Sequence, residues 1–278
     1  MTDLAISADD FHKFGEFFYR KTGIAFEDSK RYFVDKRLIE RIEATKTKTF
    51  RAYFNLLRFQ ASGDETQLLT NLMTVNETYF FREAYQFDCL IASMLNEVAI
   101  NKQPGSTIRI WSMPCSTGEE PYSIVISILD RWPKLQQYDI EIFASDIDTS
   151  VLETAQRGIF SPRSVHKATP EQLKKHFKKL ANGNWQISQD IRDSVEFSRV
   201  NLNEAADTSR FSRIDVIFCR NLLIYFDDIS RRSAASTFYQ SMSPGAFICL
   251  GHSESMSRIS SQFKVRKFDD ALVYQKPL

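Results

Sequence analysis

Five short runs of apolar, β-branched and aromatic residues recur between residues 107 and 253, and helical segments separate most of them. The runs are TIRIWSMP, DIEIFASDI, SVEFSRVNL, RIDVIFCRN and GAFICLGHS. The segments between them include GEEPYSIVISILD, DTSVLETAQRG and DISRRSAASTFYQSM. Strands that are apolar along their whole length are buried on both faces, which is typical of a parallel sheet covered by helices on either side. The pattern predicts an α/β fold.

Two further segments interrupt or extend this pattern. Residues 160–192 contain a short basic helix, PEQLKKHFKKL, then the tight-turn signal Asn182-Gly183-Asn184 and the strand-like run WQIS. They predict a small inserted subdomain with β-structure. The final run, FKVRKFDDALVYQK, has strand-like stretches on both sides of Asp269-Asp270, which predicts an antiparallel hairpin at the sheet edge.

Residues 1–75 show helical periodicity and no strand pattern. Asp9 or Asp10 is expected to cap the first helix, and Gly23 to end it. Further along, KRYFVDKRLIERIEA places apolar residues on one stripe, and TFRAYFNLLRFQ and ETQLLTNLMTV read as two more amphipathic helices. We therefore expect a helical domain over residues 1–75 and an α/β domain over residues 76–278.

The composition is that of an ordinary globular protein. The 278 residues carry 36 basic and 35 acidic side chains, so a net charge of +1 predicts no general attraction to nucleic acid or to a membrane surface. The four cysteines are scattered and three lie in apolar runs, which favours buried thiols over a metal site. No signal peptide and no apolar stretch of about 20 residues is found, so we expect a cytoplasmic protein without membrane insertion.

Polar residues follow four of the predicted strands. They are Ser116 to Glu120, Asp146 to Asp148, Asn201-Leu202 and Arg220-Asn221. Each has a plainer interpretation: a glutamate gains about 0.3–1 kcal/mol at a helix start without any ligand, and Asp148 suits an N-cap. Together they favour a ligand site, because ligands bind at the carboxyl ends of parallel strands. Asp146 has the position of the usual ribose-binding carboxylate.

The turn after the first strand indicates which ligand this is. It contains one glycine, Gly118, followed directly by Glu119 and Glu120, and the chain has neither a GxGxxG pattern nor a Walker lysine pattern. Two carboxylates oppose a pyrophosphate but suit a nucleoside with a cationic tail, because a carboxylate binds an ammonium by a charge-assisted hydrogen bond. S-adenosylmethionine is such a nucleoside.

An arginine lies inside an aromatic segment just before the α/β pattern. The run TVNETYFFREAYQF covers residues 74–87, and its aromatic side chains are interspersed with Asn76, Thr78 and Arg82. One interpretation is a linker with aromatic anchors and a solvated arginine. The other is a site in which Arg82 faces a carboxylate substrate, since arginine is seldom buried unpaired.

These motifs resemble a known family. In their order and spacing, VNETYFFRE, WSMPCSTGEEPYS, FASDID, VEFSRVNL, IFCRNLLIYFD and GHSES resemble the chemotaxis-receptor glutamate methyltransferases, the CheR family. The resemblance covers nearly the whole chain, including KRYFVDKRLIERI in the helical region. It implies a Rossmann-like sheet of the class I methyltransferases that depend on S-adenosylmethionine. The departure is Met113-Pro114-Cys115, where smaller residues are common, and it concerns the shape of the turn.

The resemblance also implies roles for individual residues. Thr78 and Arg82 would lie at the sulfonium and methyl end of the cofactor with Asn76 nearby, Glu119 would hold the methionine part, and Asp146 the ribose. The adenine would be flanked by Asn201 and Leu202, and the pocket closed by Asn221 and Leu222, with Tyr225 over the active site. The implied catalytic residues are Arg82 and Tyr225.

The implied reaction is transfer of a methyl group from S-adenosylmethionine to glutamate carboxylates on the cytoplasmic helices of chemoreceptors. A glutamate with a pKa of about 4.3 is already ionised near neutral pH, so the reaction needs no general base. Residues 30–58 hold nine basic and three acidic side chains, and Arg37 and Arg41 are candidate contacts for an acidic receptor helix. A solvated basic face is the plainer interpretation. In some family members a receptor C-terminal peptide binds the inserted subdomain; residues 160–192 leave this open.

Two other functions compete with this one. Methyltransferases of nucleobase amines often have Asn/Asp-Pro-Pro-Tyr/Phe after the fourth strand, whereas this chain has Asn221-Leu222-Leu223. A non-catalytic adaptor that binds S-adenosylmethionine is the other alternative, and the presence of Arg82 argues against it.

Overall fold

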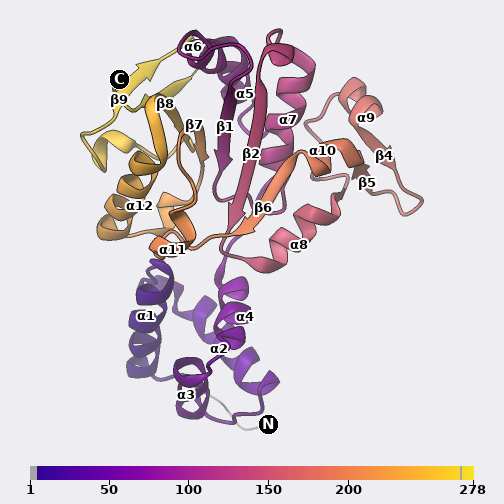
Figure 1. The fold of residues 1–278 in the computed structure, drawn as a ribbon. Helices are drawn as coiled ribbons and strands as arrows, with labels where there is room; N and C mark the ends of the chain where they lie inside the picture. The colour runs from indigo at the N-terminus through magenta and orange to yellow at the C-terminus, as the bar shows by residue number, and fades with distance from the viewer. Residues whose placement is uncertain (1–4, 270) are drawn as a thin grey trace.

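The computed structural model describes residues 5–269 and 271–278. A helical domain and an α/β domain are stacked end to end, and the helical domain lies below the central sheet in Figure 1. In the described residues the α-helices are α1 (Ala8–Thr22), α2 (Arg31–Ala44), α3 (Phe50–Phe59), α4 (Asp64–Met73), α5 (Ala84–Cys89), α6 (Leu95–Ile100), α7 (Glu119–Arg131), α8 (Thr149–Arg157), α9 (Pro170–His176), α10 (Gln189–Asp193), α11 (Ala205–Thr208) and α12 (Asp228–Ser241). None of them combines the length and the apolar content needed to span a bilayer.

The central sheet has the order β6-β2-β1-β7-β8-β10-β9. Five neighbouring strands are parallel, and the C-terminal pair is antiparallel, as a hairpin requires. The predicted fold class is confirmed, with the hairpin at the sheet edge; Asp270 lies outside the described residues. The strands of this sheet are β1 (Thr107–Ser112), β2 (Asp139–Asp146), β6 (Val195–Arg199), β7 (Ile214–Cys219), β8 (Met242–Leu250), β9 (Lys264–Lys267) and β10 (Leu272–Gln275).

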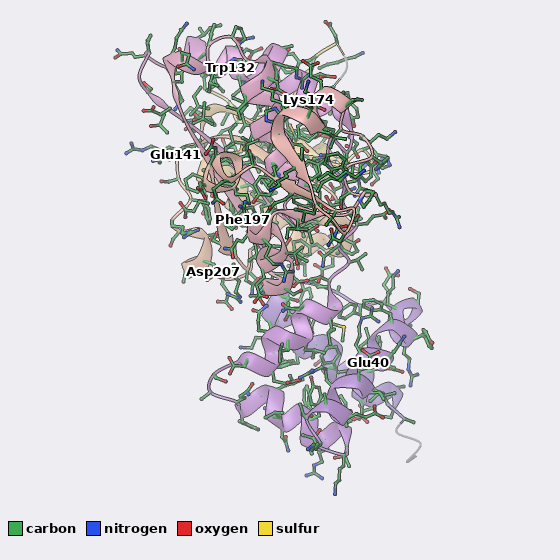
Figure 2. The ribbon with its side chains drawn as sticks, turned by 90° about the vertical axis from the view of Figure 1, so that its right-hand side faces the viewer. Glu40, Trp132, Glu141, Lys174, Phe197 and Asp207 are labelled. Atoms are coloured by element: carbon green, nitrogen blue, oxygen red, sulfur yellow. The ribbon has the colours of Figure 1, made fainter. Side chains whose placement is uncertain are left out.

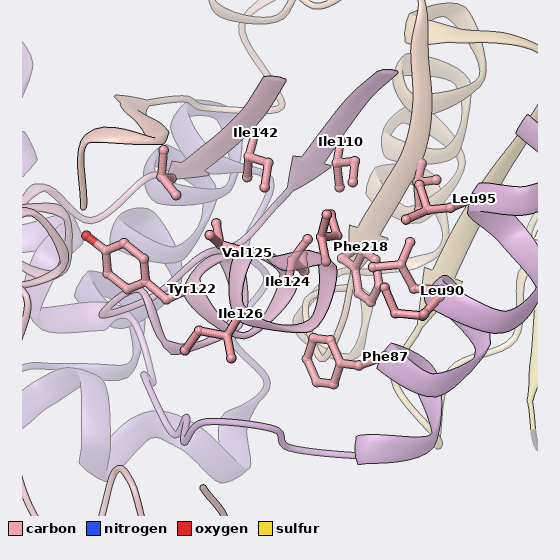
Figure 3. Close-up of a cluster of buried hydrophobic side chains, with 14 of the residues drawn as sticks. Phe87, Leu90, Leu95, Ile110, Tyr122, Ile124, Val125, Ile126, Ile142 and Phe218 are labelled. Carbon is pink, nitrogen blue, oxygen red and sulfur yellow. The ribbon is translucent and has the colours of Figure 1, made fainter. Parts of the chain in front are cut away.

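The two faces of the sheet bury separate hydrophobic clusters, because successive strand residues point to opposite faces. Ile110 of β1 belongs to the cluster that packs against α5, α6 and α7, shown in Figure 3. Its neighbour Trp111 belongs to the other cluster, where it stacks on Phe211 with ring centroids 4.1 Å apart and meets Phe238 of α12. The expected covering of both faces is thus present.

The inserted subdomain is a second sheet with the order β3-β5-β4, formed by β3 (Ile159–Phe160), β4 (Phe177–Lys179) and β5 (Trp185–Ile187). The basic helix predicted over PEQLKKHFKKL was too long, since α9 ends at His176. Residues 177–179 form β4 instead and pair with β5. The Phe177 ring packs edge-on against the Phe80 ring, with the two ring centroids 5.1 Å apart. Pairing and burial override helical periodicity at this point.

The helical domain has its own apolar core, to which α2 contributes Val34, Leu38 and Ile42. Gly23 ends α1 as predicted, with φ of 75°. The predicted cap of α1 was wrong: Ser7 has the extended backbone of a cap, and its hydroxyl accepts the Asp10 N–H at 3.1 Å. Asp9 and Asp10 lie in the first turn of the helix instead.

The helical domain is bonded to the loops at the end of the sheet. Gln67 Nε2 donates to the Ile147 carbonyl at 2.8 Å, and Thr74 Oγ1 donates to Asp148 at 2.7 Å. Figure 2 shows Glu40 on the helical domain and Asp207 at the end of the α/β domain that faces it. Several hydrogen bonds across the junction therefore fix the helical domain beside the strand ends where a ligand is expected.

An ion pair between a partly exposed arginine and a buried glutamate joins helices α2 and α4. Arg41 donates from Nε and Nη2 to the two carboxylate oxygens of Glu65 at 2.8 and 2.7 Å, and the Tyr53 hydroxyl donates to the same carboxylate at 2.7 Å. Glu65 is 5% exposed. A bidentate pair in this setting compensates the charge of Arg41 within the domain.

We predict that Arg41→Met destabilises the protein by about 3 kcal/mol, because it leaves the Glu65 carboxylate buried without its cation. Urea unfolding followed by circular dichroism measures this change. The control is Lys36→Met, an exposed position on the same helix, expected within about 0.5 kcal/mol of the unmodified protein. Equal stability of the two variants would contradict the structural role of the pair.

Candidate functional site

The turn between β1 and α7 is built for close packing. Gly118 has φ of 96°, and a Cβ at this position would lie 2.9 Å from the Ala155 Cβ of α8, so a larger residue would displace that helix. Ser116 also has a positive φ of 48°, and the Met113–Pro114 peptide bond is cis. The departure from small residues at 113–115 therefore belongs to a turn with an unusual backbone.

Asp146 at the end of β2 holds this turn. Its carboxylate accepts the Ser116 N–H at 2.8 Å and the Asp148 N–H at 3.0 Å. Burial raises the pKa of Asp146 to about 6, while these N–H donors favour the charged form. Asp148 caps α8 through Ser150 and Val151, as its plainer interpretation proposed.

Two adjoining cavities open at this end of the sheet. The first, of about 220 Å³, lies between the aromatic segment 75–87 and the loops after β1 and β7. The second, of about 440 Å³, extends under the helical domain, which contributes Phe26, Lys30 and Phe33 to its lining. Asn76, Asn221 and Tyr225 line both; Thr78 and Arg82 line the first, and Asp146 and Leu222 the second.

Glu119 and Glu120 point to different surroundings. Glu119 is buried, its carboxylate accepts the hydroxyls of Thr117 and Ser164 at 2.6 and 2.8 Å, and it is not in the lining of either cavity. Glu120 lines the first cavity. Consecutive helix residues are rotated by about 100°, so only one of the pair faces the cavity. The sequence motif names both glutamates but does not tell which one does so.

Arg220 is a buried cation that the sequence placed among the strand-end residues without indicating a role for it. Its side chain is 3% exposed and pairs with Glu120 at 3.0 Å and with Glu83 at 3.3 Å, and its Nη2 donates to the Arg82 carbonyl at 2.6 Å. An arginine inside the apolar run IFCRN was the available signal. Arg220 ties the aromatic segment to α7 and β7.

The two carboxylates respond differently to this arginine. Burial raises the pKa of Glu120, although Arg220 and the Ser112 hydroxyl favour its charged form. Burial also disfavours the charge on Glu83, but Arg220 and His252 keep its pKa below the ordinary value. Of the two carboxylates, only that of Glu120 belongs to a residue that lines the first cavity, and a carboxylate there suits a cationic ligand.

Arg82 lines the first cavity. Its Nη1 donates to the Glu77 carbonyl at 2.7 Å, and its guanidinium lies 6.0 Å from the centroid of the Tyr79 ring. Among the described residues it has no carboxylate partner within ion-pair distance. Burial raises the pKa of Tyr225, and the nearby Arg82 charge opposes this rise. Arg82 is thus a cation available to an incoming anion.

Other residues named from the sequence lie outside the two cavity linings. Asn201 and Leu202 are buried, and Asn201 Nδ2 donates to the Lys21 carbonyl of the helical domain at 2.6 Å. In the helical domain, Arg37 donates to the carbonyls of Leu72 and Phe33 and stacks over the Phe33 ring, with a centroid distance of 3.5 Å. Arg41 is the arginine paired with Glu65.

The aromatic segment also borders the inserted subdomain. A third cavity, of about 620 Å³, lies between residues 76–79 and residues 161–166. The Phe80 N–H donates to the Ser164 carbonyl at 2.9 Å, and the centroids of the Tyr79 and His166 rings lie 4.8 Å apart.

Among the described residues, no group of three or more His, Cys, Asp or Glu side chains is placed to hold a metal ion.

Comparison with known proteins identifies the family. The model of the CheR methyltransferase all-alpha domain matches residues 9–74, and that of the CheR methyltransferase SAM binding domain matches residues 76–272. A "Chemotaxis protein methyltransferase 2" of Vibrio cholerae is 56% identical over 277 residues, covering 100% of this chain and 96% of the relative. The "Chemotaxis protein methyltransferase" of Escherichia coli is 33% identical, covering 95% and 90%. The chain belongs to the CheR methyltransferase family, and its α/β domain is the domain that binds S-adenosylmethionine in that family.

Proposed function

We propose that this protein transfers a methyl group from S-adenosylmethionine to glutamate side chains on the cytoplasmic helices of chemoreceptors, forming glutamate methyl esters for chemotaxis adaptation. The observation that carries the proposal is a cavity lined both by Glu120 and by Arg82, an arginine without a carboxylate partner among the described residues. The carboxylate suits the cationic donor, and the arginine suits an anionic acceptor. The relatives, which are named chemotaxis protein methyltransferases, support a role in chemotaxis.

The cofactor assignment keeps the residues that the resemblance implies, with one change. Glu120 replaces Glu119 as the carboxylate for the ammonium group of the donor, because Glu120 lines the first cavity and Glu119 lines neither cavity. Asn76, Thr78 and Arg82 surround the methyl end of the donor. Asp146 binds the ribose. Asn201 and Leu202 stay the proposed adenine contacts, with Asn221 and Leu222 closing the pocket.

The acceptor chemistry requires orientation more than proton transfer. S-adenosylmethionine supplies an electrophilic methyl group, and an ionised glutamate is already nucleophilic. Arg82 orients the incoming carboxylate, and Tyr225 shapes its approach. A very tight pair with Arg82 would quench the nucleophile, so alignment and exclusion of water are the main contributions; alignment is worth up to about 7–11 kcal/mol in favourable systems.

The helical domain is the proposed docking surface for the receptor. Lys30 lines the second cavity, and Arg37 lacks a carboxylate partner among the described residues, so both suit an acidic helix. Arg41 contributes less, because Glu65 compensates its charge. A receptor C-terminal peptide at the inserted sheet is a further proposal, for which β4 offers an edge strand.

The reaction is tested with tritiated methyl donor and receptor fragments. We expect label on the receptor that mild alkali releases as methanol, because methyl esters hydrolyse under these conditions. In Arg82→Ala we expect kcat/KM to fall about 100-fold while the Kd for S-adenosylhomocysteine changes by less than about threefold. The control is Arg157→Ala, an exposed arginine on α8. Alkali-stable label would rule out the ester, and full turnover in Arg82→Ala would remove Arg82 from the mechanism.

The glutamate assignment is tested by comparing Glu120→Gln with Glu119→Gln. Loss of a charge-assisted hydrogen bond should weaken S-adenosylhomocysteine binding about 10- to 100-fold in the Glu120 variant. The Glu119 variant should bind within about threefold of the unmodified protein. Isothermal titration measures both, and a larger loss in Glu119→Gln would return the role to Glu119.

The Asp146 assignment predicts a pH dependence. The ionised carboxylate accepts the ribose hydroxyls, and with a pKa of about 6 it gains a proton as the pH falls, so affinity should decrease between pH 7.5 and 5.5. Asp146→Asn should bind about tenfold or more weakly at pH 7.5 and depend less on pH. An equally steep pH dependence in the variant would argue against Asp146 as the titrating group.

A further inference from the structure

The motif GHSES follows β8 and has no part in the function described so far. Its glutamate, Glu254, lies half-buried beside the loop that follows β7. That loop, residues 221–225, contributes Asn221, Ile224 and Tyr225 to both cavities. The two segments are about thirty residues apart in sequence and meet only because β7 and β8 are neighbours in the sheet.

The Glu254 carboxylate accepts three backbone N–H groups. Oε2 accepts those of Asn221 and Gly251, both at 2.8 Å, and Oε1 accepts that of Ile224 at 3.3 Å. Within the described residues no Lys, Arg or His pairs with it. Burial raises the pKa of Glu254, and the backbone donors oppose this rise. Amides converging on one carboxylate from two segments form a clamp between them.

The clamped loop has a backbone that needs support. Asn221 has φ of 58°, a left-handed conformation that is costly for a residue other than glycine and persists where the surroundings fix it. The fit is tight: a Cβ at Gly251 would lie 2.7 Å from Asn221 Nδ2 and 3.0 Å from Asn221 N. Glycine at 251 thus allows the strand end to approach the loop closely enough for the carboxylate to reach both.

We propose that Glu254 is a positioning residue: its carboxylate holds the loop 221–225 in place and thereby sets Tyr225 over the methyl-transfer site. This inference rests on the proposed function for the role of Tyr225. A glutamine at 254 keeps the size of the side chain but has one accepting oxygen, and its amide group would face N–H donors. Glu254→Gln should therefore release the loop without emptying the space around it.

The first test measures the loop itself. In Glu254→Gln, amide hydrogen exchange over residues 220–226 should be at least about tenfold faster than in the unmodified protein, since two of the clamped N–H groups belong to this loop. Glu153→Gln, an exposed glutamate on α8, is the control and should exchange as the unmodified protein does. This readout does not require turnover, so it stays valid if the methylation assignment fails. Unchanged exchange over residues 220–226 would overturn the proposal.

The second test measures coupling to Tyr225. Glu254→Gln should lower kcat/KM about tenfold or more at a temperature where circular dichroism shows it folded. Combined with Tyr225→Phe, its effect should be clearly smaller than the product of the two single effects, because both act through the same loop. Gly251→Ala, which presses on Asn221 from outside, should reproduce the loss. Fully multiplicative effects, or normal turnover in Glu254→Gln, would overturn the role in positioning Tyr225.

Discussion

The ion pairs of Arg220 hold the candidate site together. One buried guanidinium meets Glu83 from the aromatic segment and Glu120 from α7, and donates to the Arg82 carbonyl. These groups come from parts of the chain that are far apart in sequence, so the site exists only when β7 is in the sheet. Removing the arginine would leave Glu120 without its cation and Glu83 with His252 alone, and a largely buried carboxylate without its cation costs far more than a broken exposed pair.

The first cavity brings a carboxylate and an arginine together. Glu120 pairs with Arg220, whereas Arg82, in the same lining, has no carboxylate partner among the described residues. In the proposed reaction, the Glu120 carboxylate serves the cationic donor and Arg82 serves the glutamate acceptor. The ionised carboxylate of the acceptor attacks the sulfonium methyl group in this reaction, and both charges are neutralised. Water opposes this step because it stabilises the separated charges, so the enzyme needs mainly to align the reactants and to exclude water.

The helical domain takes part in this site. The Tyr19 hydroxyl donates to Asp227, Asn201 donates to the Lys21 carbonyl, and Ile24 pairs with Phe226 as a β-bridge. These contacts place Phe26 and Phe33 over the second cavity. The surface proposed to meet the receptor and the pocket proposed to hold the donor are therefore parts of one bonded arrangement.

The sequence alone determined the order of strands and helices, the hairpin, the insert and the chemistry of the strand ends, because hydrophobic period and turn residues are local properties. It named Arg82 and Asp146 through motifs. Only the tertiary structure decided that Glu120 rather than its neighbour faces the cavity, that Arg41 is paired, and that Arg220 and Glu254 clamp distant loops. Those outcomes depend on helix rotation and on which strands are neighbours, and both are fixed by packing across the whole sheet.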